Sequence, residues 1–237
     1  MTAPWRAPLS LLLGAFLGAV TSLAAVHHLG WRHLDVGAEQ ALYEQVLEAH
    51  LRRLDRVHQG LRPRWLLLGD SHLQAFPVAL LPGTAANFAI GGEPISRLAD
   101  RVPGYQHVIH AQIWVIDGGS NDLRQGASVE DVLRAWRRVI ALPPTEAGVV
   151  CLGLFPRRRA ELASITRRRE INRGIAEICA ARNAAFIDPY EALAGSDLLL
   201  RPPFDDGDGV HVSGAAYRLL AEHILRAAAT TPATATH

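Results

Sequence analysis

Short runs of consecutive apolar residues alternate with amphipathic segments over most of the chain. Runs of strand length lie at residues 65–68, 87–90, 113–116, 149–154 and 185–187. Between and after them, apolar positions recur at helical spacing over about 94–102, 128–141, 160–182 and 213–228. Strands that are apolar throughout must be covered on both faces, and the intervening helices supply that cover. The pattern predicts an α/β fold built on a parallel sheet.

An uncharged, largely apolar run at residues 8–26 precedes this alternating region, with Arg6 before it and Arg32 after it. Its length suits a membrane-spanning helix, whereas residues 22–24 would suit signal cleavage. We expect a single-pass anchor in the bacterial inner membrane, with the rest of the chain in the periplasm or outside the cell. Secretion after signal cleavage is the alternative.

Apolar residues also recur at helical spacing between residues 36 and 60, and Arg62-Pro63 ends that pattern. This helix is either a stalk between membrane and domain or a helix packed on the domain. Residues 229–237 are of low complexity, and we expect them to be disordered. The expected organisation is an anchor or signal segment at 1–35, a helical stalk at 36–62, an α/β domain at 63–228 and a tail at 229–237.

Length and charge narrow the function classes. A chain of 237 residues suits one α/β domain plus a small extra segment. Its 24 basic and 23 acidic residues give a net charge of +1, which lacks the basic excess of a nucleic-acid binder. Every basic residue is Arg, so no lysine is available as a nucleophile or base. Cys151 and Cys179 could pair in an oxidising compartment, but we expect buried free thiols.

The residues that follow the predicted strands carry the candidate chemistry, because parallel sheets bind ligands at the carboxyl ends of their strands. Gly69-Asp70-Ser71-His72 follows the first strand. A serine on a tight strand-to-helix turn is a nucleophile position, and the helix directs N–H groups toward a developing oxyanion. Asp-Ser is equally an ordinary helix N-cap, so this segment alone leaves both interpretations open.

Two further strands are followed by candidate oxyanion donors. Gly91-Gly92 allows a backbone N–H to approach a substrate closely, although a plain turn has the same sequence. Asn121, in Gly119-Ser120-Asn121-Asp122, carries a neutral side-chain donor, and Asp122 could order the loop. An Asx-turn that opens the next helix is the alternative for this segment.

A candidate base precedes the last predicted helix, in Asp208-Gly209-Val210-His211. A carboxylate three residues before a histidine can reach Nδ1, which leaves Nε2 free to accept the proton of a serine. Asp205 and Asp206 compete with Asp208 for the acidic role.

The joint order of these motifs resembles that of the SGNH hydrolases of the GDSL esterase-lipase superfamily. The matching segments are GDSH at 69–72, NFAIGG ending at Gly92, GSND at 119–122 and DGVH at 208–211. The resemblance covers about residues 64–228. It implies a three-layer α/β/α flavodoxin-like fold with a five-stranded parallel sheet, and ester hydrolysis through an acyl-enzyme without metal or cofactor.

The resemblance also implies roles. Ser71 would be the nucleophile, His211 the base and Asp208 the residue that orients it. The N–H groups of Ser71 and Gly92 and the side chain of Asn121 would form the oxyanion hole, with Gly91 as the alternative to Gly92.

Three residues would support this centre: Asp70, Asp122 and His72. His72 replaces the leucine of the name-giving motif. The GDSH form resembles variants found in bacterial cell-envelope and exopolysaccharide acylation proteins. We expect His72 to pack or to support the loop rather than to contact substrate.

These observations favour a serine ester hydrolase that acts on an ester of an envelope carbohydrate, lipid or small molecule. We expect its acyl group to be short, with acetyl as the expected group. The insertions between motifs are short, which favours a small acyl group. An O-acyltransferase for envelope or exopolysaccharide glycans, using the same triad, and a non-catalytic glycan-binding envelope protein are the alternatives. Arginine clusters at 157–159 and 167–169 face either an anionic glycan or lipid headgroup, or simply solvent.

Overall fold

The computed structural model describes residues 45, 49, 62–104 and 110–231. The chain divides into two units, Met1–Arg52 and Arg53–His237, and the fold described below is that of the second. The expected anchor at 8–26 lies outside the described residues, as does nearly all of the expected stalk. None of the helices within the described ranges combines the length and apolar character that a membrane span requires.

Five parallel strands form one sheet in the order β2-β1-β3-β4-β5. In this register Leu67 lies opposite both Asn87 and Val115, and Val115 lies opposite Val150. The strands are β1 (Trp65–Leu68), β2 (Ala85–Asn87), β3 (Ile113–Ile116), β4 (Gly148–Leu152) and β5 (Ala185–Ile187). The predicted fold class is therefore confirmed.

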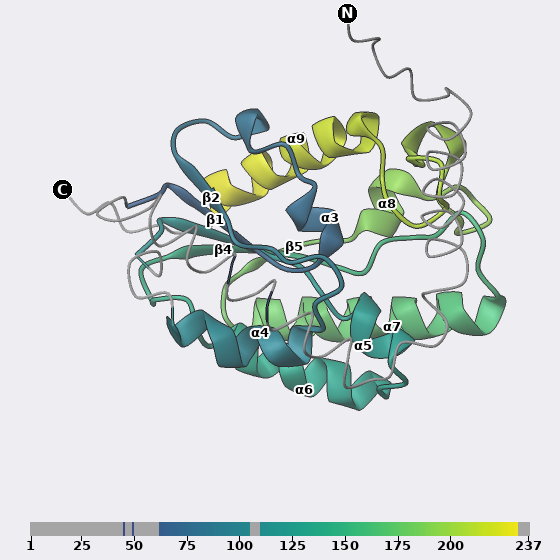
Figure 1. Cartoon of the computed structure of the whole chain (residues 1–237), viewed down its shortest axis with the longest axis horizontal. Coiled ribbons are helices and arrows are strands. Elements are labelled where there is room, and N and C mark those ends of the chain that lie inside the picture. The colour runs from purple at the N-terminus through teal and green to yellow at the C-terminus, as the bar shows by residue number, and fades with distance from the viewer. Residues whose placement is uncertain (1–44, 46–48, 50–61, 105–109, 232–237) are drawn as a thin grey trace, which may run out of the picture. The chain divides into compact units, whose positions relative to one another are not determined.

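Helices cover both faces of the sheet (Figure 1). One layer contains α4 (Ile95–Arg101), α6 (Val129–Val139) and α7 (Leu162–Ala180), and the other contains α8 (Pro189–Leu193) and α9 (Gly214–Thr230). Short helices α3 (Ser71–Gln74) and α5 (Ser120–Arg124) begin just after β1 and β3. Single 3-10 turns lie at η2 (Val78–Leu80), η3 (Val102–Gly104) and η4 (Pro202–Phe204). Helix α9 reaches two residues beyond its predicted end, into the expected tail.

Successive strand residues point to opposite faces, and this alternation assigns the two halves of the core. Leu67, Val115 and Val150 are fully buried in one cluster with Leu220 and Ile224 of α9. The sheet and the helix exclude water there, and this packing fixes the positions of β1, β3 and β4 relative to one another. The loops at their carboxyl ends therefore start from a rigid platform.

The expectation of free thiols is wrong, because Cys151 and Cys179 form a disulfide. Cys151 is one residue away from Val150 on β4, so its side chain points to the opposite face, which α7 covers. Both cysteines are fully buried. The pairing depends on how α7 packs on β4, which spacing along the chain does not report. Disulfides persist in oxidising compartments.

The second strand lies earlier than predicted, at Ala85–Asn87 instead of 87–90. Asn87 explains the early end. Its Oδ1 accepts from the N–H of Ala89 at 3.1 Å, and its Nδ2 donates to the Leu73 carbonyl at 2.7 Å. The chain is thereby turned toward α3, although the N–H of Phe88 still donates to the Leu67 carbonyl at 2.8 Å.

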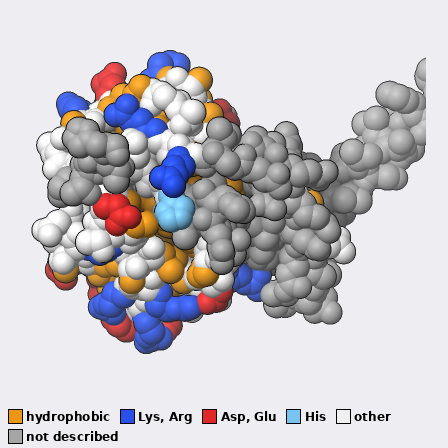
Figure 2. Space-filling model, turned by 90° about the vertical axis from the view of Figure 1, so that its left-hand side faces the viewer, with side chains coloured by type: hydrophobic (Ala, Val, Ile, Leu, Met, Phe, Trp, Pro, Cys, Tyr) orange, Lys and Arg blue, Asp and Glu red, His pale blue; other side chains and the backbone are white. Residues whose placement is uncertain are grey.

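The surface reflects the near-neutral net charge of +1. On the face shown in Figure 2, basic, acidic and hydrophobic side chains are interspersed. Among the described residues of that face, basic side chains do not merge into one broad area of the kind that tracks a nucleic-acid backbone.

Candidate active site

A serine, a histidine and a carboxylate form one hydrogen-bonded chain at the carboxyl end of the sheet. Ser71 is the first residue of α3, and its Oγ lies 2.9 Å from Nε2 of His211. Nδ1 of His211 lies 2.5 Å from Oδ2 of Asp208. The structure thus brings together two segments separated by 140 residues. The geometry allows a proton to pass from the hydroxyl to the imidazole while the carboxylate fixes the tautomer.

Asp208 is held in place by its own loop. Its Oδ1 accepts from the N–H groups of Val210 and His211, both at 2.8 Å. Partial burial acts to raise the pKa of this carboxyl, but the hydrogen bonds from His211 and Val210 outweigh it and lower the pKa to about 2. The carboxylate therefore stays ionised throughout the range in which histidine titrates.

The competing acids occupy other positions in the loop. Oδ1 of Asp205 accepts from the N–H groups of Gly207 and Gly209, at 3.1 and 2.9 Å. Asp206 donates its backbone N–H to the carbonyl of His211 at 3.1 Å. Among the three neighbouring aspartates, Asp208 is the one whose carboxylate contacts the imidazole.

The loop that carries Ser71 rests on two carboxylates. Asp70 accepts from the N–H of His72 at 3.0 Å and caps α3. The N–H of Asp70 donates to Oδ1 of Asp117 at 2.9 Å. A Cβ at Gly69 would lie 1.5 Å from that same oxygen, so any other residue would displace the support.

Sequence reasoning missed Asp117, which is buried directly after β3. Burial raises the pKa of this carboxyl well above its usual range, and the nearby charge of Asp70 raises it further. The signal was available: a carboxylate at the carboxyl end of an apolar strand has to be satisfied by neighbouring loops.

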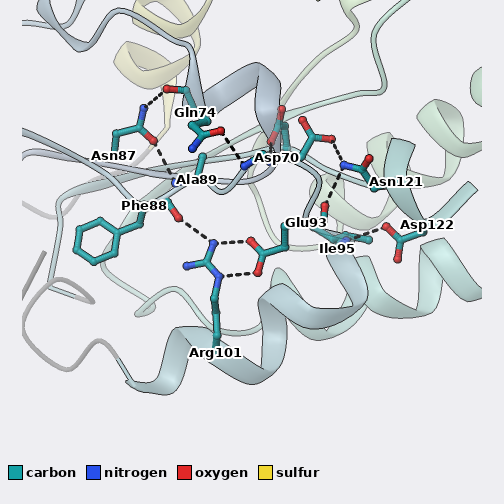
Figure 3. Close-up of polar contacts among 12 residues, drawn as sticks. Asp70, Gln74, Asn87, Phe88, Ala89, Glu93, Ile95, Arg101, Asn121 and Asp122 are labelled. Atoms are coloured by element: carbon teal, nitrogen blue, oxygen red, sulfur yellow. Dashed lines mark hydrogen bonds and ion pairs between the residues drawn. The ribbon is translucent and has the colours of Figure 1, made fainter. Parts of the chain in front are cut away.

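The Gly91-Gly92 segment forms a tight turn in which the carbonyl of Ile90 accepts from the N–H of Glu93 at 3.1 Å. Gly92 has φ +80°, which favours glycine at this position of the turn. The N–H of Gly91 is engaged by Oε1 of Gln74 at 2.9 Å (Figure 3). The N–H of Gly92 has no acceptor within the described part of the chain, so Gly92 rather than Gly91 offers a backbone donor.

Asn121 ties this turn to the serine loop. Its Nδ2 donates to Oδ2 of Asp70 at 3.3 Å and to the carbonyl of Glu93 at 3.2 Å (Figure 3). Asp122 contacts a different segment from Asn121. Its carboxylate accepts from the N–H groups of Ile95 at 2.7 Å and Ser96 at 3.2 Å. It therefore holds the start of α4, the helix that follows the glycine turn.

A buried ion pair lies behind the turn, and sequence reasoning missed it too. Arg101 donates from Nε to Oε1 of Glu93 at 2.6 Å and from Nη2 to Oε2 at 2.5 Å (Figure 3). Nη2 also donates to the carbonyl of Phe88 at 2.8 Å. The two side chains are only 5% and 1% exposed. A glutamate next to Gly92, with an arginine two helical turns later, was the available signal.

His72 packs beneath the triad. Its ring centroid lies 4.1 Å from that of Phe155 and 5.6 Å from that of His211, both edge to face. Burial lowers the pKa of His72, although the charge of Asp70 opposes this. The buried Nδ1 has no hydrogen-bond partner in the part of the chain that the structure describes. Within the described residues, His, Cys, Asp and Glu side chains form no group of three that could hold a metal ion.

The chain matches a known protein family over most of its length. The sequence model of the GDSL-like lipase/acylhydrolase family matches residues 58–219. None of the curated proteins matches the sequence significantly.

Three solved structures have a similar fold. A Streptococcus pneumonia protein, assigned provisionally as a platelet activating factor, has a TM-score of 0.67 at 19% identity, covering 81% of this chain and 99% of that one. A GDSL-like lipase from Bacteroides thetaiotaomicron has a TM-score of 0.61 at 16% identity, covering 77% and 97%. An acetylxylan esterase from Geobacillus stearothermophilus has a TM-score of 0.57 at 21% identity, covering 69% and 93%.

Proposed function

The chain belongs to the GDSL-like lipase/acylhydrolase family and is an SGNH-type serine esterase, and from this premise we propose that it cleaves a short-acyl ester through an acyl-enzyme on Ser71. The observation that carries the proposal is the chain of contacts from Ser71 Oγ through His211 to Asp208, at 2.9 and 2.5 Å. Each distance lies within the reach required for proton transfer.

In the first half of the reaction, Oγ of Ser71 attacks the ester carbonyl carbon while Nε2 of His211 takes the hydroxyl proton. The carbon–oxygen bond to the alcohol then breaks, and the imidazolium returns the proton to the leaving oxygen. In the second half, His211 removes a proton from water, which attacks the acyl carbon. The bond between the acyl carbon and Oγ then breaks, and the imidazolium returns its proton to Oγ, which frees the acid and Ser71. Asp208 keeps Nδ1 protonated throughout and stabilises the imidazolium.

The oxyanion is proposed to form between the N–H groups of Ser71 and Gly92 and the side chain of Asn121. Gly92 supports this role because its N–H is not engaged by another residue of the described chain, whereas that of Gly91 is. The bonds of Asn121 to Glu93 and Asp70 are long, at 3.2 and 3.3 Å. A charged oxygen is a stronger acceptor, so Nδ2 can turn to it as charge develops.

We propose an acetyl ester of an envelope carbohydrate, lipid or small molecule as the substrate. The similar fold of an esterase that acts on acetylxylan is compatible with this choice, as are the short connections between the motifs. A location outside the cytoplasm is supported by the uncharged run at 8–26 and by the buried disulfide between Cys151 and Cys179.

The proposal is tested with full-length protein and 4-nitrophenyl esters of increasing chain length, alongside Ser71→Ala. We expect kcat/KM to be highest for acetate and to be lost in Ser71→Ala. A preference for long acyl chains would overturn the short-acyl assignment, and full activity in Ser71→Ala would overturn the nucleophile.

Product analysis in the presence of an acetylated donor and a glycan acceptor separates hydrolysis from transfer. Free acetate without acylated glycan is the expected result. Acylated glycan as the main product would establish the O-acyltransferase alternative, and glycan binding without turnover of any ester would establish the non-catalytic one.

A further inference from the structure

Two arginines lie beside the triad at the carboxyl end of β4. Arg168 reaches out of α7 and donates from Nη1 to Oγ of Ser120 at 3.0 Å and to the carbonyl of Phe155 at 3.3 Å. Ser120 immediately precedes Asn121, and the ring of Phe155 packs on His72. Arg168 is therefore fixed against the same loops that carry the candidate oxyanion donor and the floor of the triad.

The backbone around Arg157 is also held by hydrogen bonds. Its backbone carbonyl accepts from the N–H of Leu200 at 3.0 Å. The N–H of the next residue, Arg158, donates to the carbonyl of Gly209 at 2.9 Å, and Gly209 lies between Asp208 and His211. The backbone of Arg157 is thus joined to the triad loop, while its half-buried guanidinium has no hydrogen-bond or ion-pair partner in the described part of the chain.

Within the described residues the positive charge at this edge is balanced only in part, because the charge of Asp70 acts on both guanidinium groups without forming an ion pair with either. No carboxylate of the described residues forms an ion pair with Arg157 or Arg168. Asp188 binds Arg169 instead, and Asp70 accepts from the backbone of His72 and from Asn121.

Burial makes this arrangement costly. Arg168 is 3% exposed, and its Nε has no hydrogen-bond partner among the described residues. Burial, together with the charge of Arg157, lowers the pKa of Arg168 to about 10, against the opposing effects of Tyr190 and Asp70. Burial also lowers the pKa of Arg157, and the exposed Arg124 of α5 adds to the lowering, whereas Tyr190 and Asp70 oppose it. A buried or half-buried guanidinium without an ion-pair partner is costly to the fold, so two of them at a reaction centre favour the binding of an anion there.

We infer that Arg157, backed by Arg168, binds a carboxylate or phosphate group of the ester substrate. This inference rests on the proposed esterase function and narrows its substrate class to anionic esters, such as an acylated acidic sugar or an anionic lipid headgroup. A guanidinium presents paired donors that match either anion in bidentate geometry. Since the N–H of Arg158 joins this segment to the triad loop at Gly209, we take the anion and the scissile ester to be parts of the same molecule.

Matched esters test the inference. 4-Acetoxybenzamide, 4-acetoxybenzoate and 4-acetoxyphenyl phosphate place no anion, a carboxylate or a phosphate on the alcohol half. 4-Nitrophenyl butyrate and 4-nitrophenyl hydrogen succinate do the same for the acyl half. Each kcat/KM is compared between wild type, Arg157→Gln and Arg157→Lys, so that the intrinsic reactivity of each ester cancels. Arg159→Gln, an exposed arginine two residues away, is the matched control.

For at least one anionic ester, Arg157→Gln is expected to lower kcat/KM roughly 10- to 100-fold, the loss typical of a charge-assisted contact, and to affect the neutral partner far less. Arg157→Lys restores part of the loss, and Arg159→Gln changes no ratio. The loss shrinks in 0.5 M NaCl because salt screens the contact. Whether the carboxylate or the phosphate ester shows the larger loss distinguishes an acidic sugar from a lipid headgroup.

An equal loss for neutral and anionic esters in Arg157→Gln would overturn the inference and leave Arg157 a purely structural role. No loss for any ester would overturn it as well. If wild type hydrolysed none of the esters, the proposed function would fail instead. The anion site would then be judged by calorimetric binding of 4-hydroxybenzoate, which must be weaker in Arg157→Gln if the inference holds.

Discussion

The ion pair between Glu93 and Arg101 makes the sharpest prediction about how the oxyanion turn is held. Glu93 lies next to Gly92, and its own carbonyl accepts from Asn121 at 3.2 Å. Its carboxylate is bound bidentately by Arg101 with the side chain only 1% exposed. Replacing Arg101 by Met keeps a side chain of similar size but removes the bidentate contact to this buried carboxylate.

Removal of one partner of a buried ion pair typically costs about 3–5 kcal/mol of unfolding free energy. For a domain of this size each kcal/mol lowers Tm by roughly 2–4 °C, so we expect Arg101→Met to lower Tm by roughly 6–20 °C. The turn that carries Gly92 should shift with it. We therefore expect kcat to fall on the order of 10²-fold, as for loss of one oxyanion donor, with a much smaller change in KM. KM changes less because the oxyanion exists only in the transition state and the intermediate.

Urea unfolding and steady-state kinetics of Arg101→Met, Glu93→Gln and the double variant measure both effects. The double variant removes both charges, so it should be more stable than the sum of the single losses predicts. A purely structural pair would lower stability but leave kcat unchanged in the folded fraction. The reasoning would be refuted by strictly additive stability losses, or by an Arg101→Met variant with wild-type Tm.

Three further predictions concern the triad, a buried histidine and the disulfide. Asp208→Asn should lower kcat on the order of 10⁴-fold, because no carboxylate then holds the imidazole proton on Nδ1, while Asp205→Asn should change kcat little. The opposite pattern in steady-state kinetics would assign the orienting role to Asp205. Burial holds the pKa of His72 below 6.5 in the folded state, so below about pH 6.5 the unfolded chain binds the proton first and stability falls. Urea unfolding of wild type and His72→Leu between pH 7.5 and 5 should show a smaller fall in the variant, and parallel pH profiles would contradict this. The bond between Cys151 and Cys179 closes a loop with a sequence separation of 28, so its reduction should cost about 3–4 kcal/mol of unfolding free energy. Urea unfolding with and without dithiothreitol measures this cost, and identical curves for a demonstrably reduced sample would argue against the bond.

Local patterns in the sequence predicted the sheet and the motif residues, because each depends on neighbours along the chain. The run at 113–116 is buried throughout, as its apolar sequence predicts. Ser71 and Asn121 follow apolar strands, and His211 precedes a helix whose apolar residues recur at helical spacing. The strand at 85–87 was misplaced because its boundary depends on an Asn87 side chain that bonds across to α3.

The features that sequence reasoning missed all depend on distant contacts. Cys151 meets Cys179 only because α7 packs on β4, and the role of Asp117 follows from the position of Asp70 across the sheet. The glycine assignment shows the same dependence. The sequence favoured Gly92 with Gly91 as the alternative, and in the structure the Gln74 side chain distinguishes them by engaging the N–H of Gly91.

The central claim is that Ser71 is an activated nucleophile beside a working base. Its most direct test is covalent labelling of the full-length protein with a fluorophosphonate, located by peptide mass spectrometry. We expect a single adduct on Ser71, strong attenuation in His211→Ala and none in Ser71→Ala. A folded wild-type protein that takes no label, or takes it at another serine, would contradict the account.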